Sequence, residues 1–186
     1  MAEIAKIIVS GPFGSGKTTF IKYVSDEQFS GNDVPTTGEL AKLKAMTTVG
    51  MDFGILHVDD ELDVHLFGTP GQSRFAFMWK IMAKGALGTI FLVDGASERA
   101  LKEAQTMLKT YKEMPDMKLV VGVSKQDLPE AQSLNDIANL LDLGNTPMFA
   151  IDAREEKDAR FLIMALLQEI LAGDEADDLD LVEDSY

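Results

Sequence analysis

Residues 11–18 read Gly-Pro-Phe-Gly-Ser-Gly-Lys-Thr and match the GxxxxGK[S/T] pattern of a phosphate-binding loop. They follow directly on the apolar run 4–10, which predicts a strand, and they precede a predicted helix at 18–25. In such a loop the backbone N–H groups converge on phosphate oxygens, and the positive end of the helix dipole points at them. Lys17 would add a point charge for the β- and γ-phosphates, and Thr18 a hydroxyl for Mg²⁺. The chain is therefore predicted to bind a nucleoside phosphate.

The composition describes one acidic domain. The chain has 186 residues, no cysteine and a formal net charge of -14. Without cysteine there is neither a disulfide nor a thiolate metal site, and the acidic balance disfavours nucleic acid as a partner. Residues 173–186 are rich in acids and contain no base, which predicts a disordered tail after a domain at 1–172. A docking peptide for a basic partner is the alternative for this tail.

The chain shows no feature of a membrane protein. Its apolar windows are shorter than a membrane span, and neither a leader segment nor a lipidation motif is present. We therefore expect a cytoplasmic protein without a direct membrane anchor.

Beyond the first helix, the pattern predicts a long mobile segment at 26–47 and then alternating strands and helices. Strands 51–58 and 62–67 are predicted to form an antiparallel hairpin. Later strands are predicted at 88–93, 118–123 and 147–151, and helices at 75–84, 97–114, 133–141 and 155–172. This order predicts an α/β fold with a mostly parallel six-stranded sheet, one antiparallel edge strand and helices on both faces. Ligands of such sheets lie at the carboxyl ends of the strands.

The loops after the predicted strands carry a family resemblance. Thr-Pro-Gly-Gln stands at 69–72, Ser-Lys-Gln-Asp-Leu-Pro at 124–129 and Asp-Ala-Arg at 152–154. In this order and spacing the chain resembles the Ras-like small GTPases over residues 4–170. It is similar to the ADP-ribosylation-factor branch in Lys-Gln-Asp-Leu-Pro and in Thr-Val-Gly at 48–50. It is similar to the bacterial gliding-motility GTPases in Thr-Pro-Gly-Gln. The resemblance implies a P-loop NTPase G domain of a prokaryotic branch, which binds GTP or GDP with Mg²⁺ and acts as a switch.

The purine is predicted to be guanine. Asp127 can accept hydrogen bonds from guanine N1–H and the 2-amino group, whereas adenine presents a lone pair and no amino group there. The resemblance implies that the stem of Lys125 covers the purine and that the backbone N–H of Ala153 meets guanine O6. Ser124 replaces the asparagine of the family, and its shorter side chain is expected to weaken the tie to the phosphate loop and to reduce affinity. The predicted nucleotide-binding set is Gly11, Phe13, Gly14, Ser15, Gly16, Lys17, Thr18, Thr19, Thr48, Gly71, Ser124, Lys125, Asp127, Leu128, Asp152, Ala153 and Arg154.

The metal side departs from the family pattern. Thr18 and Thr48 are the predicted Mg²⁺ ligands, and Gly68 stands where most relatives have an aspartate. Mg²⁺ is therefore expected to bind less firmly in the GDP form. Thr37 competes with Thr48 for the switch position, but the separation of Thr48 from Gln72 fits one hairpin with its turns.

The resemblance also assigns roles in hydrolysis. Gln72 is predicted to orient the attacking water while Gly71 donates its N–H to the γ-phosphate, and Lys17 and Thr48 complete the catalytic set. The side chain of Phe13 would crowd Gln72, so slow turnover is expected. Arg74 is a candidate for an arginine finger in cis, and a plain surface arginine is the simpler interpretation.

Several alternatives stay open at this point. Met51 and Trp79 could form an effector-facing patch or pack in the core, and His57 and His65 fit strand packing or exposure better than a metal site. The resemblance implies regulatory and effector proteins as partners, such as a roadblock-type activator or a sensor-kinase pathway. A pseudo-GTPase that binds nucleotide without useful turnover is the main rival function. A P-loop kinase or ATPase is disfavoured because its acceptor lid would need more arginine.

Overall fold

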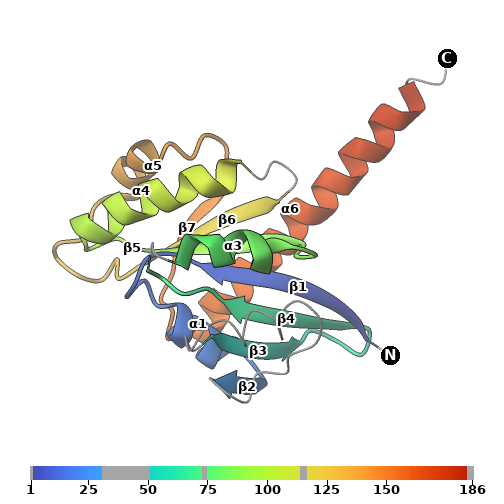
Figure 1. The fold of residues 1–186 in the computed structure, drawn as a ribbon, viewed down its shortest axis with the longest axis horizontal. Helices are drawn as coiled ribbons and strands as arrows, with labels where there is room; N and C mark the ends of the chain where they lie inside the picture. Colours follow the sequence, from blue (N-terminus) through green and yellow to red (C-terminus); the bar gives the residue numbers. More distant parts are fainter. Residues whose placement is uncertain (1, 31–50, 73–74, 114–116, 184–186) are drawn as a thin grey trace.

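A seven-stranded sheet, flanked by helices, organises the chain in the computed structural model, which describes residues 2–30, 51–72, 75–113 and 117–183 (Figure 1). The strand order is β2-β3-β4-β1-β5-β6-β7. The strands are β1 (Glu3–Ser10), β2 (Glu27–Ser30), β3 (Asp52–His57), β4 (Leu62–Gly68), β5 (Gly88–Asp94), β6 (Lys118–Ser124) and β7 (Met148–Ala150). The helices are α1 (Lys17–Val24), α3 (Ala76–Ala83), α4 (Glu98–Lys112), α5 (Leu134–Leu141) and α6 (Glu156–Glu183).

The α/β fold class is confirmed, and the predicted number of strands was wrong. Strand β2 adds a seventh strand inside the segment 26–47 that was predicted to be mobile. Strand β3 runs antiparallel to both of its neighbours, β2 and β4, so the antiparallel strand is second from the edge. Residues 31–50 lie outside the described residues.

Alternating side chains on the strands pack against helices on both faces of the sheet. On β1, Ile7 and Val9 are fully buried in a cluster with side chains of α1 and α6. Ile8, between them, packs on the other face with Met78 and Met82 of α3. A third cluster joins α4 and α5 to β5 and β6. The sheet is therefore covered on both sides, which accounts for the continuous apolar runs in its central strands.

Side-chain hydrogen bonds begin helix α5 and close the β3–β4 hairpin. The hydroxyl of Ser133 caps α5 by accepting from the backbone N–H of Asp136 at 3.2 Å. Between β3 and β4, the Asp59 carboxylate accepts from the backbone N–H groups of Glu61 and Leu62 at 2.8 and 2.9 Å. These contacts account for the start of α5 and for the turn between β3 and β4.

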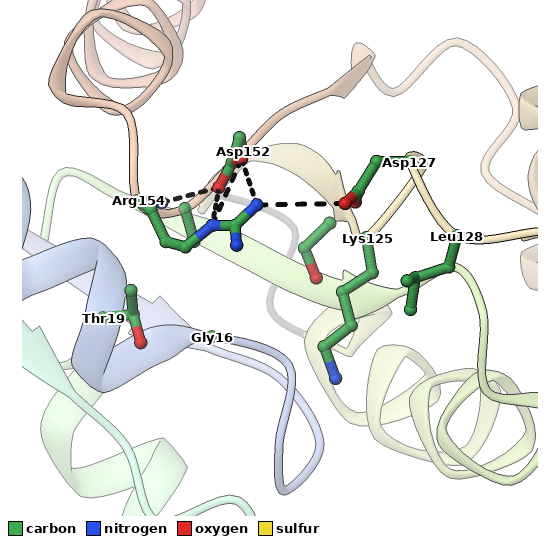
Figure 2. Close-up of a pocket in the computed structure, with 9 residues that line it drawn as sticks. Gly16, Thr19, Lys125, Asp127, Leu128, Asp152 and Arg154 are labelled. Atoms are coloured by element: carbon green, nitrogen blue, oxygen red, sulfur yellow. Dashed lines mark hydrogen bonds and ion pairs between the residues drawn. The ribbon is translucent and has the colours of Figure 1, made fainter.

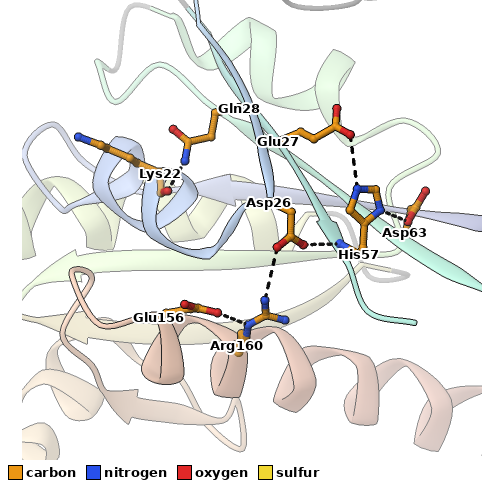
Figure 3. A network of polar contacts seen from close by, with 8 residues as sticks. All are labelled: Lys22, Asp26, Glu27, Gln28, His57, Asp63, Glu156 and Arg160. Carbon is orange, nitrogen blue, oxygen red and sulfur yellow. Dashed lines mark hydrogen bonds and ion pairs between the residues drawn. The ribbon is translucent and has the colours of Figure 1, made fainter. Parts of the chain in front are cut away.

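Polar contacts fasten the edge strand β2 (Figure 3). The carboxylate of Asp26 accepts from the backbone N–H of His57 at 2.9 Å, and it lies 3.8 Å from Arg160 of α6. The His57 imidazole lies 2.6 Å from Asp63 and 3.5 Å from Glu27. The pKa of His57 is raised, and the hydrogen bond with Asp63 is the largest cause. The negative charge of Asp63 and the hydrogen bond with Glu27 raise this pKa further.

Helix α6 extends beyond the sheet toward the C-terminus (Figure 1). It continues to Glu183, so residues 174–183 of the predicted disordered tail are helical here, and the domain boundary at 172 stays a prediction. In the part of α6 whose side chains are described, Ala159, Leu162, Ile163 and Leu166 are buried in the core. Over the described part of the chain, no helix combines the length and apolarity needed to cross a bilayer.

The topology gathers several loops at one edge of the sheet. Strands β4, β1, β5, β6 and β7 are mutually parallel, so their carboxyl ends meet. The phosphate loop follows β1, and the predicted base loops follow β6 and β7. The residues of the candidate site therefore come together although they lie far apart in the sequence.

Candidate functional site

The phosphate loop joins β1 to α1 through a backbone that requires glycine. Gly11 and Gly16 have φ angles of 137° and 99°, in a region that L side chains rarely adopt. A Cβ atom on Gly11 would lie 2.0 Å from the carbonyl oxygen of Leu92. A Cβ atom on Gly16 would lie 3.1 Å from the Cβ atom of Ala153, so the phosphate loop and the loop after β7 touch there. The loop is thus wedged between β5 and the base side of the site.

Lys17 lies across this loop. Its ammonium group donates to the carbonyl oxygens of Gly11 at 2.8 Å and Pro12 at 2.7 Å, and the residue is 9% exposed. Burial lowers the pKa of Lys17 to about 8, and the negative charge of Asp52 offsets part of that effect. A phosphate placed here would favour the charged ammonium, which is the behaviour expected of a phosphate-binding lysine.

Ser124 ties the base loop to the phosphate loop. Its buried hydroxyl lies 3.1 Å from the carbonyl oxygen of Ser15 and 3.1 Å from that of Val93. The shorter side chain of serine still reaches the phosphate loop, because the end of β6 runs close to it. The expected reduction in nucleotide affinity stays a prediction. The two loops remain connected by a buried polar contact.

A cavity of about 250 Å³ opens between the phosphate loop and the two base loops (Figure 2). This volume is at the lower end for small-molecule sites, as expected for a pocket that takes one part of a ligand. Each residue lining the cavity belongs to the nucleotide-binding set predicted from the sequence. These residues are Gly16, Thr19, Ser124, Lys125, Asp127, Leu128, Asp152, Ala153 and Arg154.

Ion pairs order the mouth of the cavity. The Arg154 guanidinium forms a fork on Asp152, with Nε 2.9 Å from Oδ1 and Nη2 2.7 Å from Oδ2. Hydrogen bonds from Arg154 lower the pKa of Asp152 to about 2. Figure 2 shows the same guanidinium between Asp152 and Asp127, and its Nη2 atom lies 3.9 Å from Asp127 Oδ2. Asp127 keeps a 64% exposed side chain that is open to a ligand.

Lys125 is fixed by a residue that the sequence analysis missed. Its ammonium group lies 2.5 Å from the carboxylate of Asp94 at the end of β5, and its backbone φ is 60°. Asp94 also accepts from the backbone N–H of Ala96 at 3.0 Å. The pairing of β5 with β6, which sets Asp94 opposite Ser124, is the structural signal for this contact.

On the metal side, the Thr18 hydroxyl donates to the carboxylate of Asp52 at 2.6 Å. Asp52 was also missed, because it lies on β3, 34 positions away from Thr18 in the sequence. The antiparallel register of β3 and β4 was the signal that could have found it, since this register sets Asp52 beside Gly68. The second predicted metal ligand, Thr48, lies outside the described residues.

The residues predicted for hydrolysis are only partly described. Gly71 lies against the phosphate loop, because a Cβ atom added to it would be 2.7 Å from Lys17 Nζ and 2.7 Å from the backbone nitrogen of Phe13. Gln72 follows on the surface, and the Phe13 side chain is 76% exposed. Arg74 lies outside the described residues.

Two alternatives from the sequence are resolved by burial. Met51 and Trp79 are 5% and 2% exposed and pack in the core, and Trp79 Nε1 donates to the carbonyl oxygen of Pro70 at 3.2 Å. His57 contacts carboxylates, while His65 packs edge-on against Phe53. Over the described residues, no group of three or more acidic, histidine or cysteine side chains is arranged to bind a metal ion.

Comparisons with known proteins agree with this geometry. The sequence model of a family described as "Conserved hypothetical ATP binding protein" matches residues 27–173, a range that begins after the phosphate loop. The uncharacterized protein MJ1339 of Methanocaldococcus jannaschii is 34% identical over 56% of this chain, and the match spans 59% of that protein's length.

Two curated relatives belong to the Ras-related proteins. Rab-27B of Homo sapiens is 25% identical over 90% of this chain and 80% of its own length. Rab-3 of Caenorhabditis elegans is 26% identical over 94% of this chain and 77% of its own length. Among solved structures, the Arl6 BBS3 small GTPase from Trypanosoma brucei, with bound GppNp, shares the fold with a TM-score of 0.66. It is 19% identical, and the match covers 91% of this chain and 99% of that one.

The fold, the strand-end loops and these relatives define a nucleotide-binding protein of the Ras-like small GTPase superfamily. The chain belongs to the family described as conserved hypothetical ATP binding proteins, whose match covers most of its length.

Proposed function

We propose that the protein is a guanine-nucleotide switch that binds GTP or GDP with Mg²⁺ and slowly hydrolyses GTP to GDP and phosphate. In this proposal, Thr48 and Gly71 bind the γ-phosphate and are released after hydrolysis. The surface formed by residues 26–50 and 68–84 then changes, and regulatory or effector proteins, such as a roadblock-type activator, recognise the difference.

The observation that carries the proposal is the cavity beside the phosphate loop. Lys125 and Asp127 of the loop after β6 line it, together with Gly16 of the phosphate loop and Ala153 of the loop after β7. A Cβ atom on Gly16 would lie 3.1 Å from the Cβ atom of Ala153. A purine in this cavity would lie beside the phosphate loop. Its phosphates would then extend along that loop toward the buried ammonium group of Lys17. The donor set also fits a metal ion, because the Thr18 hydroxyl is already oriented by a carboxylate. When bound, Mg²⁺ neutralises charge on the β- and γ-phosphates.

The name of the family raises ATP as the competing ligand. Asp127 distinguishes the two purines by its chemistry, because a carboxylate accepts two hydrogen bonds from guanine and none from the N1 and C2–H edge of adenine. An unsatisfied carboxylate in the complex costs kilocalories, so adenine nucleotides are expected to bind at least about a hundredfold more weakly.

Calorimetry with GDP and ADP tests this choice, and Asp127→Asn sharpens the test. An asparagine amide accepts from N1–H of xanthine and donates to its 2-oxo group, so the variant should lose GDP affinity and gain affinity for xanthosine diphosphate. The conservative change Asp127→Glu keeps the charge and should not produce the xanthine gain. Equal binding of ADP and GDP by the unaltered protein would contradict the guanine assignment.

For hydrolysis, the proposal assigns positioning roles to Gln72 and Lys17. Small GTPases without an arginine finger turn over at about 10⁻⁴ s⁻¹, and Phe13 on the adjacent loop gives no added charge. Phosphate release should therefore be slow in the unaltered protein and slower still in Gln72→Leu and Lys17→Ala. The rival function is an interaction module without useful turnover, and it predicts the same background rate in all three proteins.

A further inference from the structure

A carboxylate from a neighbouring strand lies at the hydroxyl end of the phosphate loop. Asp52 is the first residue of β3, and its Oδ2 atom accepts the hydrogen bond of the Thr18 hydroxyl at 2.6 Å. Thr18 is the residue directly after Lys17 in the loop, and Asp52 is also the charge that acts on Lys17. Asp52 thus contacts the part of the loop that would face a metal ion.

This contact determines which way the hydroxyl points. A threonine hydroxyl has one proton and two lone pairs. With its proton donated to Asp52, Thr18 can present a lone pair only on its other side, as a metal ligand must. Carboxylates that accept from a ligand in this way fix its orientation and increase its basicity.

The position of Asp52 also bears on residue 68, which is a glycine without a side chain. The antiparallel register pairs Phe53 of β3 with Phe67 of β4, which brings Asp52 beside Gly68. A Cβ atom on Gly68 would lie 3.1 Å from the Cβ atom of Asp52 and 3.0 Å from Cδ1 of Ile21. The two positions share one space, so an acid can be supplied from residue 52 or from residue 68.

Electrostatics gives the carboxylate a reason to be there. A carboxylate beside the phosphates of a bound nucleotide repels them, and with a divalent cation between the groups both contacts become attractive. Oxygen ligands of this kind, together with phosphate oxygens and water, are the ones that Mg²⁺ prefers.

We propose that Asp52 is the metal-side carboxylate of this nucleotide site, which orients Thr18 toward the cation and takes over from the glycine at 68. The inference rests on the proposed binding of a guanine nucleotide at residues 11–18. It makes nucleotide affinity depend on Mg²⁺ through a residue of β3.

The test measures GDP affinity by calorimetry over a series of Mg²⁺ concentrations and in EDTA. In Asp52→Ala the Mg²⁺ midpoint should rise about 10–100-fold, the usual loss for a residue that supports a metal ligand. In EDTA the same variant should bind GDP at least as tightly as the unaltered protein, because a negative charge beside the phosphates has been removed. A structural defect would weaken binding in both conditions.

Control variants separate the possible outcomes. Asp63→Asn removes a carboxylate from the same hairpin, away from the loop, and should leave the midpoint unchanged. Asp52→Asn is nearly isosteric and still accepts from Thr18, so its midpoint should also rise while folding is preserved. The double change Asp52→Gly with Gly68→Asp moves the acid into the shared space and should restore the midpoint.

An unchanged midpoint in Asp52→Asn, or an equal rise in Asp63→Asn, would overturn the inference. A double variant that stays at the level of Asp52→Ala would contradict the shared-space argument. If neither the unaltered protein nor any variant binds GDP, the proposed function itself fails, and that result is distinct from a failure of Asp52.

Discussion

At the scale of single residues, Lys17 shows how the fold prepares a charge for a ligand. Its pKa of about 8 results first from burial, with Asp52 acting in the opposite direction. In the unfolded chain an ordinary lysine binds its proton up to about pH 10.4. Between these values the unfolded state binds more protons, so the contribution of Lys17 to folding stability becomes more favourable as the pH rises from 8 to 10.

This pKa predicts proton uptake when GDP binds. The phosphates stabilise the ammonium form, so at pH 9 the binding event should take up a fraction of a proton that approaches one. Above pH 8 the affinity for GDP should fall by up to about tenfold per pH unit. Calorimetry in two buffers of different ionisation enthalpy measures the uptake. Lys17→Met should abolish it, and an uptake that persists in this variant would assign the proton to another group.

The sequence identified the candidate residues in local loop motifs, and it missed those that strand pairing brings to the site. The phosphate loop and the loop after β6 are local motifs, so Lys125 and Asp127 were found from the sequence alone. Asp52 and Asp94 act through strand register, which no local motif encodes. The contact of Ser124 with the phosphate loop could not be judged from residue type, because the reach of a side chain depends on how close two backbones run.

At the scale of elements, β2 is the strand that the sequence did not reveal. Its residues, Glu-Gln-Phe-Ser, lack the alternation of apolar and polar residues that marks a half-buried strand. The strand depends on pairing with β3 and on the contact of Glu27 with His57 of β3. The preceding residue, Asp26, contacts the backbone of His57 and Arg160 of α6. The other strands contain β-branched and apolar runs, so their own composition predicted them.

The two histidines of the β3–β4 hairpin should have pKa values shifted in opposite directions. Contacts with Asp63 and Glu27 raise the pKa of His57 above 6.5, whereas burial lowers the pKa of His65 below 6.5. Nuclear magnetic resonance titration measures both in one sample. The contribution of His57 to β2 is complete below pH 6.5 and is lost as the pH rises through its folded pKa. Because Asp63 is the largest cause, Asp63→Asn should lower the His57 pKa more than Glu27→Gln does. The reverse order would contradict this assignment.

At the scale of the whole molecule, helix α6 has two parts. Its first turns pack in the core, and its C-terminal part extends beyond the sheet. Among the residues of α6 whose burial is described, Leu166 is the last buried one, and the segment 173–186 contains no base. The described core is formed by the sheet, the helices packed on it and the first turns of α6. The boundary at residue 172 stays a prediction, which a truncated chain can test.

A chain that ends at residue 172 should fold with the stability of the full chain. The apolar side chains of the described core lie at or before Ile170, so we expect the free energy of unfolding to change by less than about 0.5 kcal/mol. Urea unfolding of both chains at moderate salt checks this, and GDP affinity provides a second readout. A loss of several kcal/mol would show that the helical extension belongs to the domain.

The close approach of Gly16 to Ala153 brings the phosphate loop against the loop after β7. Because a Cβ atom on residue 16 would lie 3.1 Å from that of residue 153, neither position has room to grow. Changes meant to alter the choice of base are therefore better placed at other cavity residues, such as Lys125 and Asp127. A bulkier residue at 153 would push the loop after β7 away from the phosphate loop. We expect this to weaken the binding of all nucleotides, whatever their base.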